Sequence, residues 1–309
     1  MTSTTTAPGV YVTGTATELS ARLDAERRAG ASVGVVLTMG ALHEGHASLI
    51  ARAAAECDVV VVSIFVNPTQ FAEPGDLANY PRTLESDLEV ARRAGCDLVF
   101  APSVTEMYPD WPESAATTVT VRSLGDRWEG LSRPGHFDGV ATVVAKLLST
   151  AGRCRTYFGE KDFQQLAIVR LMVRDLSLPV EVVGCPIVRE ADGLAISSRN
   201  VRLSPEERAA AVCLSRALSA GAEAFGAGGD RSAVESAMTA VVVAEPLAVL
   251  DYAVLVDAHD LEPADLEPAG DKATGATGTG RPLRLLIAVQ IGPVRLIDNL
   301  DPRVSRAAG

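Results

Sequence analysis

The sequence lacks several features that would place it in common classes of protein. It has no run of about 18 or more apolar residues, the length that a membrane-spanning helix needs. Residues Met1–Thr6 lack the charged and apolar regions of a signal peptide, so we expect a cytoplasmic protein. Aromatic residues make up only 5% of the chain, and the core must therefore consist mainly of Ala, Val and Leu.

The sequence is also poor in cysteine and in positive charge. Its five cysteines lie far apart and form no CxxC or Cys/His pairing, which argues against a zinc site and favours reduced, structural thiols. The formal net charge of −11 argues against binding of nucleic acid, which requires a cationic face. An acidic protein that binds phosphates must concentrate its few cations locally.

The order of helices and strands divides the chain into two parts. A length of 309 residues favours two domains. From about residue 19 to residue 187, helices alternate with apolar strands, which is typical of βαβ units and a parallel sheet. After Asn200, helices are followed by antiparallel strands. We therefore expect an α/β fold: a Rossmann-like parallel sheet with helices on both faces over residues 1–187, and a smaller α+β domain over residues 188–309.

Hydrophobic periodicity predicts the individual elements. In the first part we expect helices over Glu18–Ala29, Ala47–Glu56, Leu84–Ala94, Gly139–Thr150 and Lys161–Leu176, and strands over Val33–Leu37, Val59–Val66, Asp97–Ala101, Arg155–Phe158 and Val180–Val183. In the second part we expect a capping box at Ser204–Glu207 that opens a long Ala-rich helix, a helix around Ser232–Val243, and strands over Val249–Val256 and Leu283–Ile291. The intervening residues 264–282, rich in Gly, Ala and Thr, are interpreted as a mobile insertion.

The segment Met39–His46 carries the strongest functional signal. It lies between a predicted strand and a predicted helix, and the free N–H groups of such a helix's first turn bind anions. Gly40 and Gly45 would let a ligand approach the backbone. His43 and His46, two of only four histidines in the chain, lie in the same turn. Because the spacing differs from an NAD fingerprint and from a Walker loop, we predict another kind of phosphate or nucleotide site.

Further polar segments follow other predicted strands, where parallel sheets bind their ligands. Asn67 and Gln70 present amide groups after one strand, and Lys161 supplies a point charge for phosphate after another. Arg199 lies near the junction of the two domains, a favoured place for ligands. Residues 133–137 are interpreted as a loop that delivers cations over a substrate. Taken singly, several of these segments could be ordinary turns.

As a set, these candidates are rich in cations and poor in nucleophiles. The sequence has no Gly-x-Ser-x-Gly elbow and no cysteine with its own histidine partner. Such a site fits phosphoryl or nucleotidyl transfer, in which catalysis is mainly positioning and charge stabilisation. The nucleophile would then be a group on a substrate.

Several segments, in one order from about residue 10 to residue 300, resemble the pantoate–β-alanine ligase family of the HxGH nucleotidyltransferase superfamily. They are TMGALHEGH (38–46), VSIFVNPTQF (62–71), YPRT (80–83), RPGHFDGV (133–140), YFGEKDFQQL (157–166), VREADGLAISSRN (188–200) and LIDN (296–299). The resemblance implies a ligation in two steps, in which pantoate reacts with ATP to give pantoyl adenylate and β-alanine then displaces AMP to give pantothenate, the vitamin B5 precursor of coenzyme A. It also implies Mg²⁺ on the triphosphate and a homodimer.

The functional residues of the family carry over to matching positions. The resemblance implies catalytic roles for His43, His46, Lys161 and Arg199, with His46 as the family's proton donor; we interpret both histidines as stabilisers of charge on the phosphates. The implied ATP site comprises Met39, Gly40, Ala41, Leu42, His43, Glu44, Gly45, His46, Gly159, Glu160, Lys161, Asp162, Val188, Ile196, Ser197, Ser198 and Arg199. Gln70 and Gln165 would bind pantoate, and Gln70 also β-alanine. Asp87 is a weaker candidate for the metal's hydration shell.

Two alternatives remain open on these residues. A different HxGH nucleotidyltransferase would adenylylate a phosphate ester and form a pyrophosphate rather than an amide. A non-catalytic nucleotide-binding regulator could retain the fold, but the presence of both histidines, Lys161 and Arg199 favours an enzyme. The expected partners are therefore the small molecules ATP, pantoate and β-alanine, with no nucleic acid and no membrane.

Overall fold

The computed structural model describes residues 6–7, 9–71, 74–113, 115–264 and 281–304. The chain forms two compact units. Unit 1 comprises residues 1–160 and 164–188, and unit 2 comprises residues 161–163 and 189–309. The predicted insertion over residues 264–282 falls almost entirely outside the described residues, as does the stretch Met1–Thr6.

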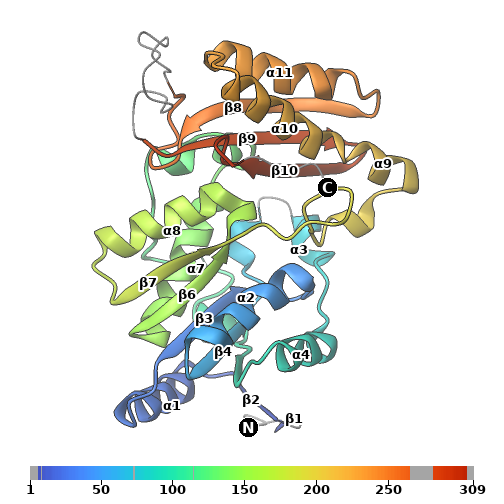
Figure 1. Ribbon diagram of the computed structural model, residues 1–309. Coiled ribbons are helices and arrows are strands. Elements are labelled where there is room, and N and C mark those ends of the chain that lie inside the picture. The colour runs from blue at the N-terminus through green and yellow to red at the C-terminus, as the bar shows by residue number, and fades with distance from the viewer. Residues whose placement is uncertain (1–5, 8, 72–73, 114, 265–280, 305–309) are drawn as a thin grey trace. The chain divides into compact units, whose positions relative to one another are not determined.

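Unit 1 is built on a seven-stranded sheet in the order β1-β2-β5-β4-β3-β6-β7 (Figure 1). Its strands are β1 (Thr6–Ala7), β2 (Val10–Thr13), β3 (Val33–Thr38), β4 (Val59–Ile64), β5 (Leu98–Phe100), β6 (Cys154–Gly159) and β7 (Val180–Cys185). Strands β2 to β7 run parallel, and β1 pairs antiparallel with β2. The predicted parallel sheet is confirmed.

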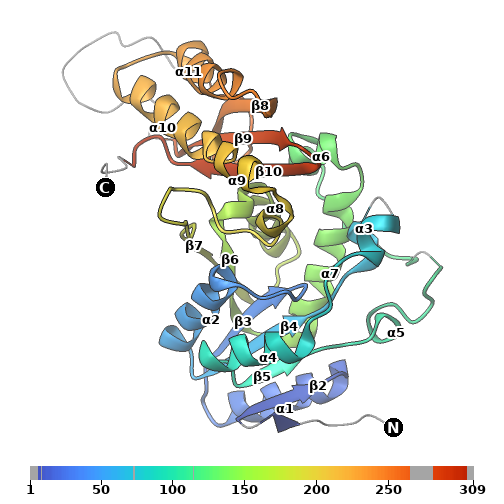
Figure 2. The same cartoon turned by 90° about the vertical axis from the view of Figure 1, so that its right-hand side faces the viewer.

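Helices cover both faces of this sheet. On one face lie α2 (Glu44–Glu56) and α4 (Leu84–Arg93), and on the other lie α1 (Ala16–Arg28), α7 (His136–Ala151) and α8 (Phe163–Asp175) (Figure 2). This division follows from the right-handed crossover between parallel strands. The short helices are η1 (Pro68–Gln70), α3 (Pro74–Ala78), α5 (Val104–Met107), η2 (Leu124–Asp126), α6 (Glu129–Ser132) and η3 (Glu160–Asp162).

The chain changes its direction across the sheet between β3 and β6. From β3 it passes through α2 to β4 on one side, and from β6 through α8 to β7 on the other. The two strands pair in parallel, with Gly34 opposite Arg155 and Val36 opposite Tyr157. Doubly wound sheets bind ligands beyond the carboxyl ends of their strands at such a switch point. We therefore expect a ligand-binding site at the turn that follows β3.

Unit 2 contains a three-stranded antiparallel sheet in the order β10-β9-β8. Its elements are η4 (Asn200–Arg202), α9 (Pro205–Ala210), α10 (Cys213–Gly226), α11 (Arg231–Val243), β8 (Ala248–Asp257), β9 (Leu283–Ile291) and β10 (Val294–Leu300). Helices α10 and α11 pack against the sheet and bury Leu218, Met238 and Ile287 completely. The predicted α+β character is confirmed, but β10 was not predicted, and the long Ala-rich helix is two helices, α9 and α10.

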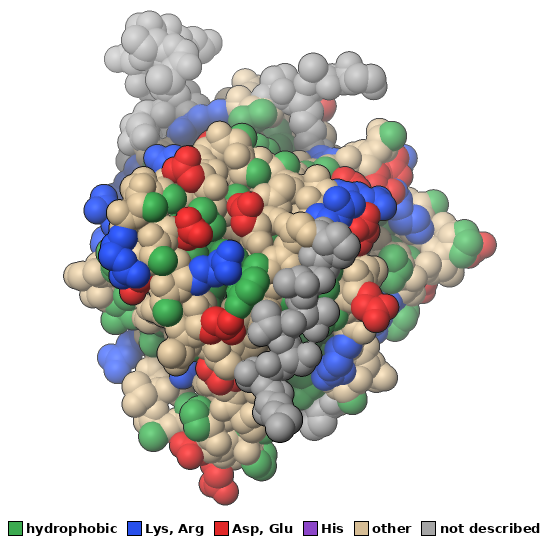
Figure 3. Space-filling model, turned by 90° about the horizontal axis from the view of Figure 1, so that it is seen from below, with side chains coloured by type: hydrophobic (Ala, Val, Ile, Leu, Met, Phe, Trp, Pro, Cys, Tyr) green, Lys and Arg blue, Asp and Glu red, His purple; other side chains and the backbone are tan. Residues whose placement is uncertain are grey.

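In the described part of the chain, no helix is both long and apolar enough to cross a membrane. Figure 3 views the molecule from the side of α1 and β2. On this face, Lys and Arg side chains lie interspersed with Asp and Glu, so positive charge is not gathered into one patch.

Candidate active site

A buried carboxylate from α4 holds the turn that follows β3. Asp87 is only 2% exposed, and its Oδ1 accepts a hydrogen bond from the Leu42 N–H at 2.7 Å. Its Oδ2 accepts from the Ala41 N–H at 3.1 Å, and the Thr83 hydroxyl donates to both oxygens at 3.2 Å. Gly40 has φ +86°, and a Cβ there would lie 3.0 Å from Asp87 Oδ2. Glycine therefore allows the carboxylate to approach, and the turn is shaped by the fold itself.

His43 and His46 form a capping box at the start of α2. His43 Nδ1 accepts a hydrogen bond from the Gly45 N–H at 3.1 Å, and His46 Nδ1 accepts from the His43 N–H at 3.3 Å. In a neutral imidazole the other nitrogen then carries the hydrogen, so both Nε2 atoms are assigned as donors. The ring centroids lie 4.1 Å apart. The cap thus sets two N–H donors at a helix N-terminus, whose dipole also favours an anion.

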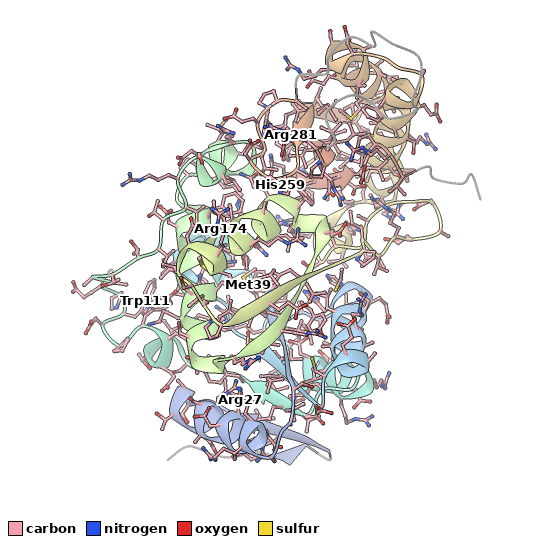
Figure 4. All side chains as sticks on the ribbon, turned by 60° about the vertical axis from the view of Figure 1, so that its left-hand side comes forward. Arg27, Met39, Trp111, Arg174, His259 and Arg281 are labelled. Carbon is pink, nitrogen blue, oxygen red and sulfur yellow. The ribbon has the colours of Figure 1, made fainter. Side chains whose placement is uncertain are left out.

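A buried amide network after β4 fixes the orientation of Gln70. Its Oε1 accepts from Asn67 Nδ2 at 3.0 Å, and its Nε2 lies 2.8 Å from the sulfur of Met39, which is labelled in Figure 4. Asn67 Oδ1 accepts from the hydroxyls of Thr69 at 3.0 Å and Tyr108 at 2.9 Å. Asn67 therefore cannot flip without losing both bonds. The network turns the amide N–H₂ of Gln70 toward Met39, the first residue of the predicted anion-binding turn.

The start of α7 supports the same segment. His136 Nδ1 donates to the Gln70 carbonyl at 2.9 Å, which leaves Nε2 to accept from Arg133 Nη1 at 3.1 Å. Gly139 approaches so closely that a Cβ there would lie 2.4 Å from the Thr69 carbonyl oxygen. The helix begins at His136 rather than at Gly139, and His136 is buried within it. This histidine supports the backbone of Gln70.

The two neighbouring glutamines at the start of α8 differ in their contacts. Gln164 Nε2 donates to the carbonyls of Leu124 at 2.6 Å and Arg127 at 2.8 Å, and its Oε1 accepts from the Glu129 N–H at 3.1 Å. Gln165 is half-buried and makes no side-chain hydrogen bond within the described structure. Gln164 therefore holds the segment 124–129, whereas the amide of Gln165 is available to a ligand.

In unit 2, the backbone at Lys161 is held from β10. Asn299 Nδ2 donates to the Lys161 carbonyl at 2.9 Å. The Lys161 ammonium lies 3.8 Å from Asp162 Oδ1, and the lysine side chain is 17% exposed. At this distance from a largely exposed carboxylate the pairing is weak, which leaves the ammonium able to bind another anion.

The segment that contains Arg199 follows a tight hairpin over residues 189–195. The Glu190 N–H donates to the Leu194 carbonyl at 2.8 Å, and Arg189 and Ala195 form an isolated β-bridge. Beyond the hairpin, Ser197 Oγ accepts from the Arg199 N–H at 3.3 Å, and Arg199 itself is exposed. Of the other predicted ATP-binding residues, Glu44 is exposed and the following are half-buried: Gly159, Glu160, Val188, Ile196, Ser197 and Ser198.

The described residues contain no candidate metal cluster, and burial raises the pKa of several of their cysteines. They include no group of three or more His, Cys, Asp or Glu side chains that could hold a metal ion. The carboxylate of Asp87 accepts hydrogen bonds on both oxygens, and its role in a metal's hydration shell stays a prediction. All five cysteines are free. Burial raises the pKa of Cys96 and Cys154 to about 12 and of Cys213 to about 11, so these thiols stay protonated at neutral pH.

Sequence comparison finds relatives that cover nearly the whole chain. Residues 11–301 match the model of a family described as Pantoate-beta-alanine ligase. The chain is 53% identical over 287 residues to the pantothenate synthetase of Rubrobacter xylanophilus, covering 91% of this chain and 94% of that protein. It is 51% identical over 275 residues to the pantothenate synthetase of Salinispora arenicola, covering 89% and 92%.

Structural comparison gives the same family. The pantothenate synthetase of Thermus thermophilus matches with a TM-score of 0.83 and 47% identity, covering 94% of this chain and 99% of that one. The pantoate–β-alanine ligase of Francisella tularensis, solved in complex with β,γ-ATP and β-alanine, matches with a TM-score of 0.74 and 30% identity, covering 95% and 98%.

Proposed function

The chain belongs to the pantoate–β-alanine ligase family, and from this premise we propose how its residues carry the reaction. The enzyme condenses pantoate with β-alanine to pantothenate at the expense of ATP. The carboxylate of pantoate attacks the α-phosphorus of ATP, and pyrophosphate leaves. The amine of β-alanine then attacks the acyl carbon of the pantoyl adenylate, and AMP leaves. Adenylation is needed because a bare carboxylate is a poor electrophile and oxide is a poor leaving group.

The capping box at the start of α2 is the observation that carries the proposed ATP site. Its geometry makes the Nε2 atoms of His43 and His46 hydrogen-bond donors at the N-terminus of α2, where the helix dipole also favours an anion. As pyrophosphate leaves, negative charge grows on the phosphate oxygens. Preorganised donors stabilise that charge without reorganising during the reaction. We assign to these two histidines the stabilisation of the first transition state.

Gln70 and Gln165 are assigned to pantoate. The Asn67 contact presents the N–H₂ of Gln70, a donor suited to a carboxylate or hydroxyl oxygen. Gln165 has an amide without a partner in the described fold. Gln70 is also assigned to β-alanine, which must reach the acyl carbon of the same pantoyl group.

Residues of unit 2 are assigned to the same ATP molecule. Lys161 and Arg199 bring positive charge, and Ser197 and Ser198 bring hydroxyl groups; Val188, at the end of unit 1, completes the set. Mg²⁺ is expected on the phosphates of ATP, whose negative charge it would neutralise. We also expect the enzyme to act in the cytoplasm as a homodimer.

Omitting each substrate in turn tests this function. AMP release should require ATP, pantoate and β-alanine together, whereas exchange of pyrophosphate into ATP should require pantoate but not β-alanine. A product that joins AMP to a phosphate ester would instead indicate another HxGH nucleotidyltransferase. Tight binding of ATP without turnover under any combination would indicate a regulator.

Replacing Gln70 with alanine should raise the KM for pantoate about tenfold or more, the equivalent of one hydrogen bond to a charged group. The KM for ATP should change much less, because Gln70 is assigned to the acid rather than to the nucleotide. Steady-state kinetics with each substrate varied in turn would measure both constants. A matched control is Gln290→Ala, since the amide of Gln290 donates to the Gly292 carbonyl of unit 2 at 2.8 Å and is assigned to neither substrate. A larger rise in the KM for ATP than for pantoate would contradict the assignment.

A further inference from the structure

Two adjacent polar residues are buried near the end of β10. Asp298 and Asn299 lie in this strand of the unit 2 sheet, and they are only 3% and 2% exposed although both side chains are polar. A buried carboxylate and a buried amide are costly unless their hydrogen-bonding groups find partners. The partners of these two side chains therefore indicate what the pair does.

Asn299 holds the segment that contains Lys161. Its Nδ2 donates to the Lys161 carbonyl at 2.9 Å, and its Oδ1 accepts from Arg284 Nε at 2.7 Å. The guanidinium carbon of Arg284 lies 4.3 Å from the centroid of the Phe163 ring. Asn299 thus holds the backbone of Lys161 directly, and Arg284, which Asn299 orients, packs on the side chain of Phe163 two residues later.

Asp298 holds the hairpin that leads to Arg199. Its two oxygens accept from Arg189 Nη1 at 2.6 Å and Nη2 at 2.9 Å, a bidentate pair. The same guanidinium donates to the Gly193 carbonyl at 3.0 Å and the Asn299 carbonyl at 3.3 Å. Arg189 and Ala195 pair across the hairpin. The contact of Arg189 with Asp298 therefore also fixes Ala195 with respect to β10, and the segment Ile196–Arg199 begins directly after Ala195.

We propose that Asp298 and Asn299 are positioning residues for adenylate formation. From adjacent places on one strand they set the spacing between the segment of Lys161 and the segment of Ser197–Arg199. The inference rests on the proposed assignment of those segments to ATP. Neither residue is assigned a contact with the nucleotide; each acts through the backbone that carries a phosphate-binding side chain.

Asn299→Ala should lower the kcat of pantoate-dependent ATP–pyrophosphate exchange roughly 10- to 100-fold, as expected when phosphate-binding groups are displaced by about an ångström. The KM for pantoate should stay within about twofold, because Gln70 shares no partner with Asn299. Asp298→Asn should act in the same direction. The matched control is Asp251→Asn in β8, which weakens the ion pair with Arg295 of β10 without touching either segment.

Thermal unfolding of each variant separates positioning from stability. If Asn299→Ala and Asp298→Asn unfold at lower temperature but keep wild-type kcat and KM for ATP when assayed while folded, the inference is wrong. If Asn299→Ala does not fold, Arg189→Lys replaces it, since lysine keeps the charge but loses the bidentate geometry and should lower kcat about three- to tenfold. A wild-type kcat in that variant would equally contradict the proposal.

Lys161→Ala and Arg199→Ala, measured in the same exchange assay, distinguish two kinds of failure. Wild-type exchange in both would refute the ATP assignment on which this inference depends. Slow exchange in both, together with wild-type exchange in Asn299→Ala and Asp298→Asn, would refute the positioning role alone.

Discussion

Replacing His46 with alanine is expected to slow adenylate formation about 10²- to 10³-fold while the protein remains folded, the usual cost of losing one preorganised donor in an oxyanion-type site. The imidazole is held by its own helix cap, so its Nε2 is oriented before ATP arrives. Pantoate-dependent ATP–pyrophosphate exchange measures this step without the second one. The lost cap itself should lower the free energy of unfolding by only about 1 kcal/mol.

Two control variants separate the imidazole from the cap. In His46→Gln the side-chain carbonyl can still accept from the His43 N–H, as glutamine does at this position of a capping box, but the imidazole is gone. We expect His46→Gln to have the wild-type free energy of unfolding but to remain as slow as His46→Ala in the exchange assay. His259→Ala, an exposed histidine of unit 2 labelled in Figure 4, should change neither. Recovery of exchange in His46→Gln would mean that His46 contributes to activity only through the helix.

Asp87→Ala should have the largest effect on stability, a loss of about 2 to 4 kcal/mol in the free energy of unfolding. Two backbone N–H groups, those of Ala41 and Leu42, lose the carboxylate that accepts from them, and burial leaves little water to replace it. Adenylate formation should fall as well, because the turn that carries the histidines loosens. Chemical denaturation and the exchange assay measure the two effects.

The matched control for Asp87 is Glu85→Ala, which removes an exposed carboxylate from the same first turn of α4. It should cost less than about 1 kcal/mol, the size of an exposed interaction with the helix dipole. If Asp87 instead serves the hydration shell of Mg²⁺, stability should be unchanged and higher Mg²⁺ should restore the rate. That result would overturn the structural role assigned here.

The sequence predicts well those elements whose stabilisation is local. The valine-rich strand Val59–Ile64 is recognised by its apolar run, and the capping box at Ser204 by its residue types. Helix α2 begins at Glu44, three residues before the predicted start at Ala47, because a histidine acts as its N-cap. Histidine is not among the usual capping residues, so the pattern gives no signal there.

Contacts between distant residues set the limit of the prediction. Strand β10 escapes prediction because Asp298 and Asn299 interrupt its apolar pattern, and both residue types are rare in strands. Their partners Lys161 and Arg189 lie 138 and 109 residues away in the chain. Tyr108 likewise reaches Asn67 over 41 residues. The local sequence at Lys161 and Asn67 predicts a site, but it predicts none of these long-range contacts.

The proposed mechanism requires that cations from separate stretches of the chain act on one nucleotide. A crystal structure with pantoate and a non-hydrolysable ATP analogue tests this most directly. We expect Nε2 of His43 and of His46, the Lys161 ammonium and the Arg199 guanidinium each within about 3 Å of a phosphate oxygen of the same analogue molecule. An analogue bound with its phosphates away from His46, or with Lys161 and Arg199 turned toward other groups, would contradict it.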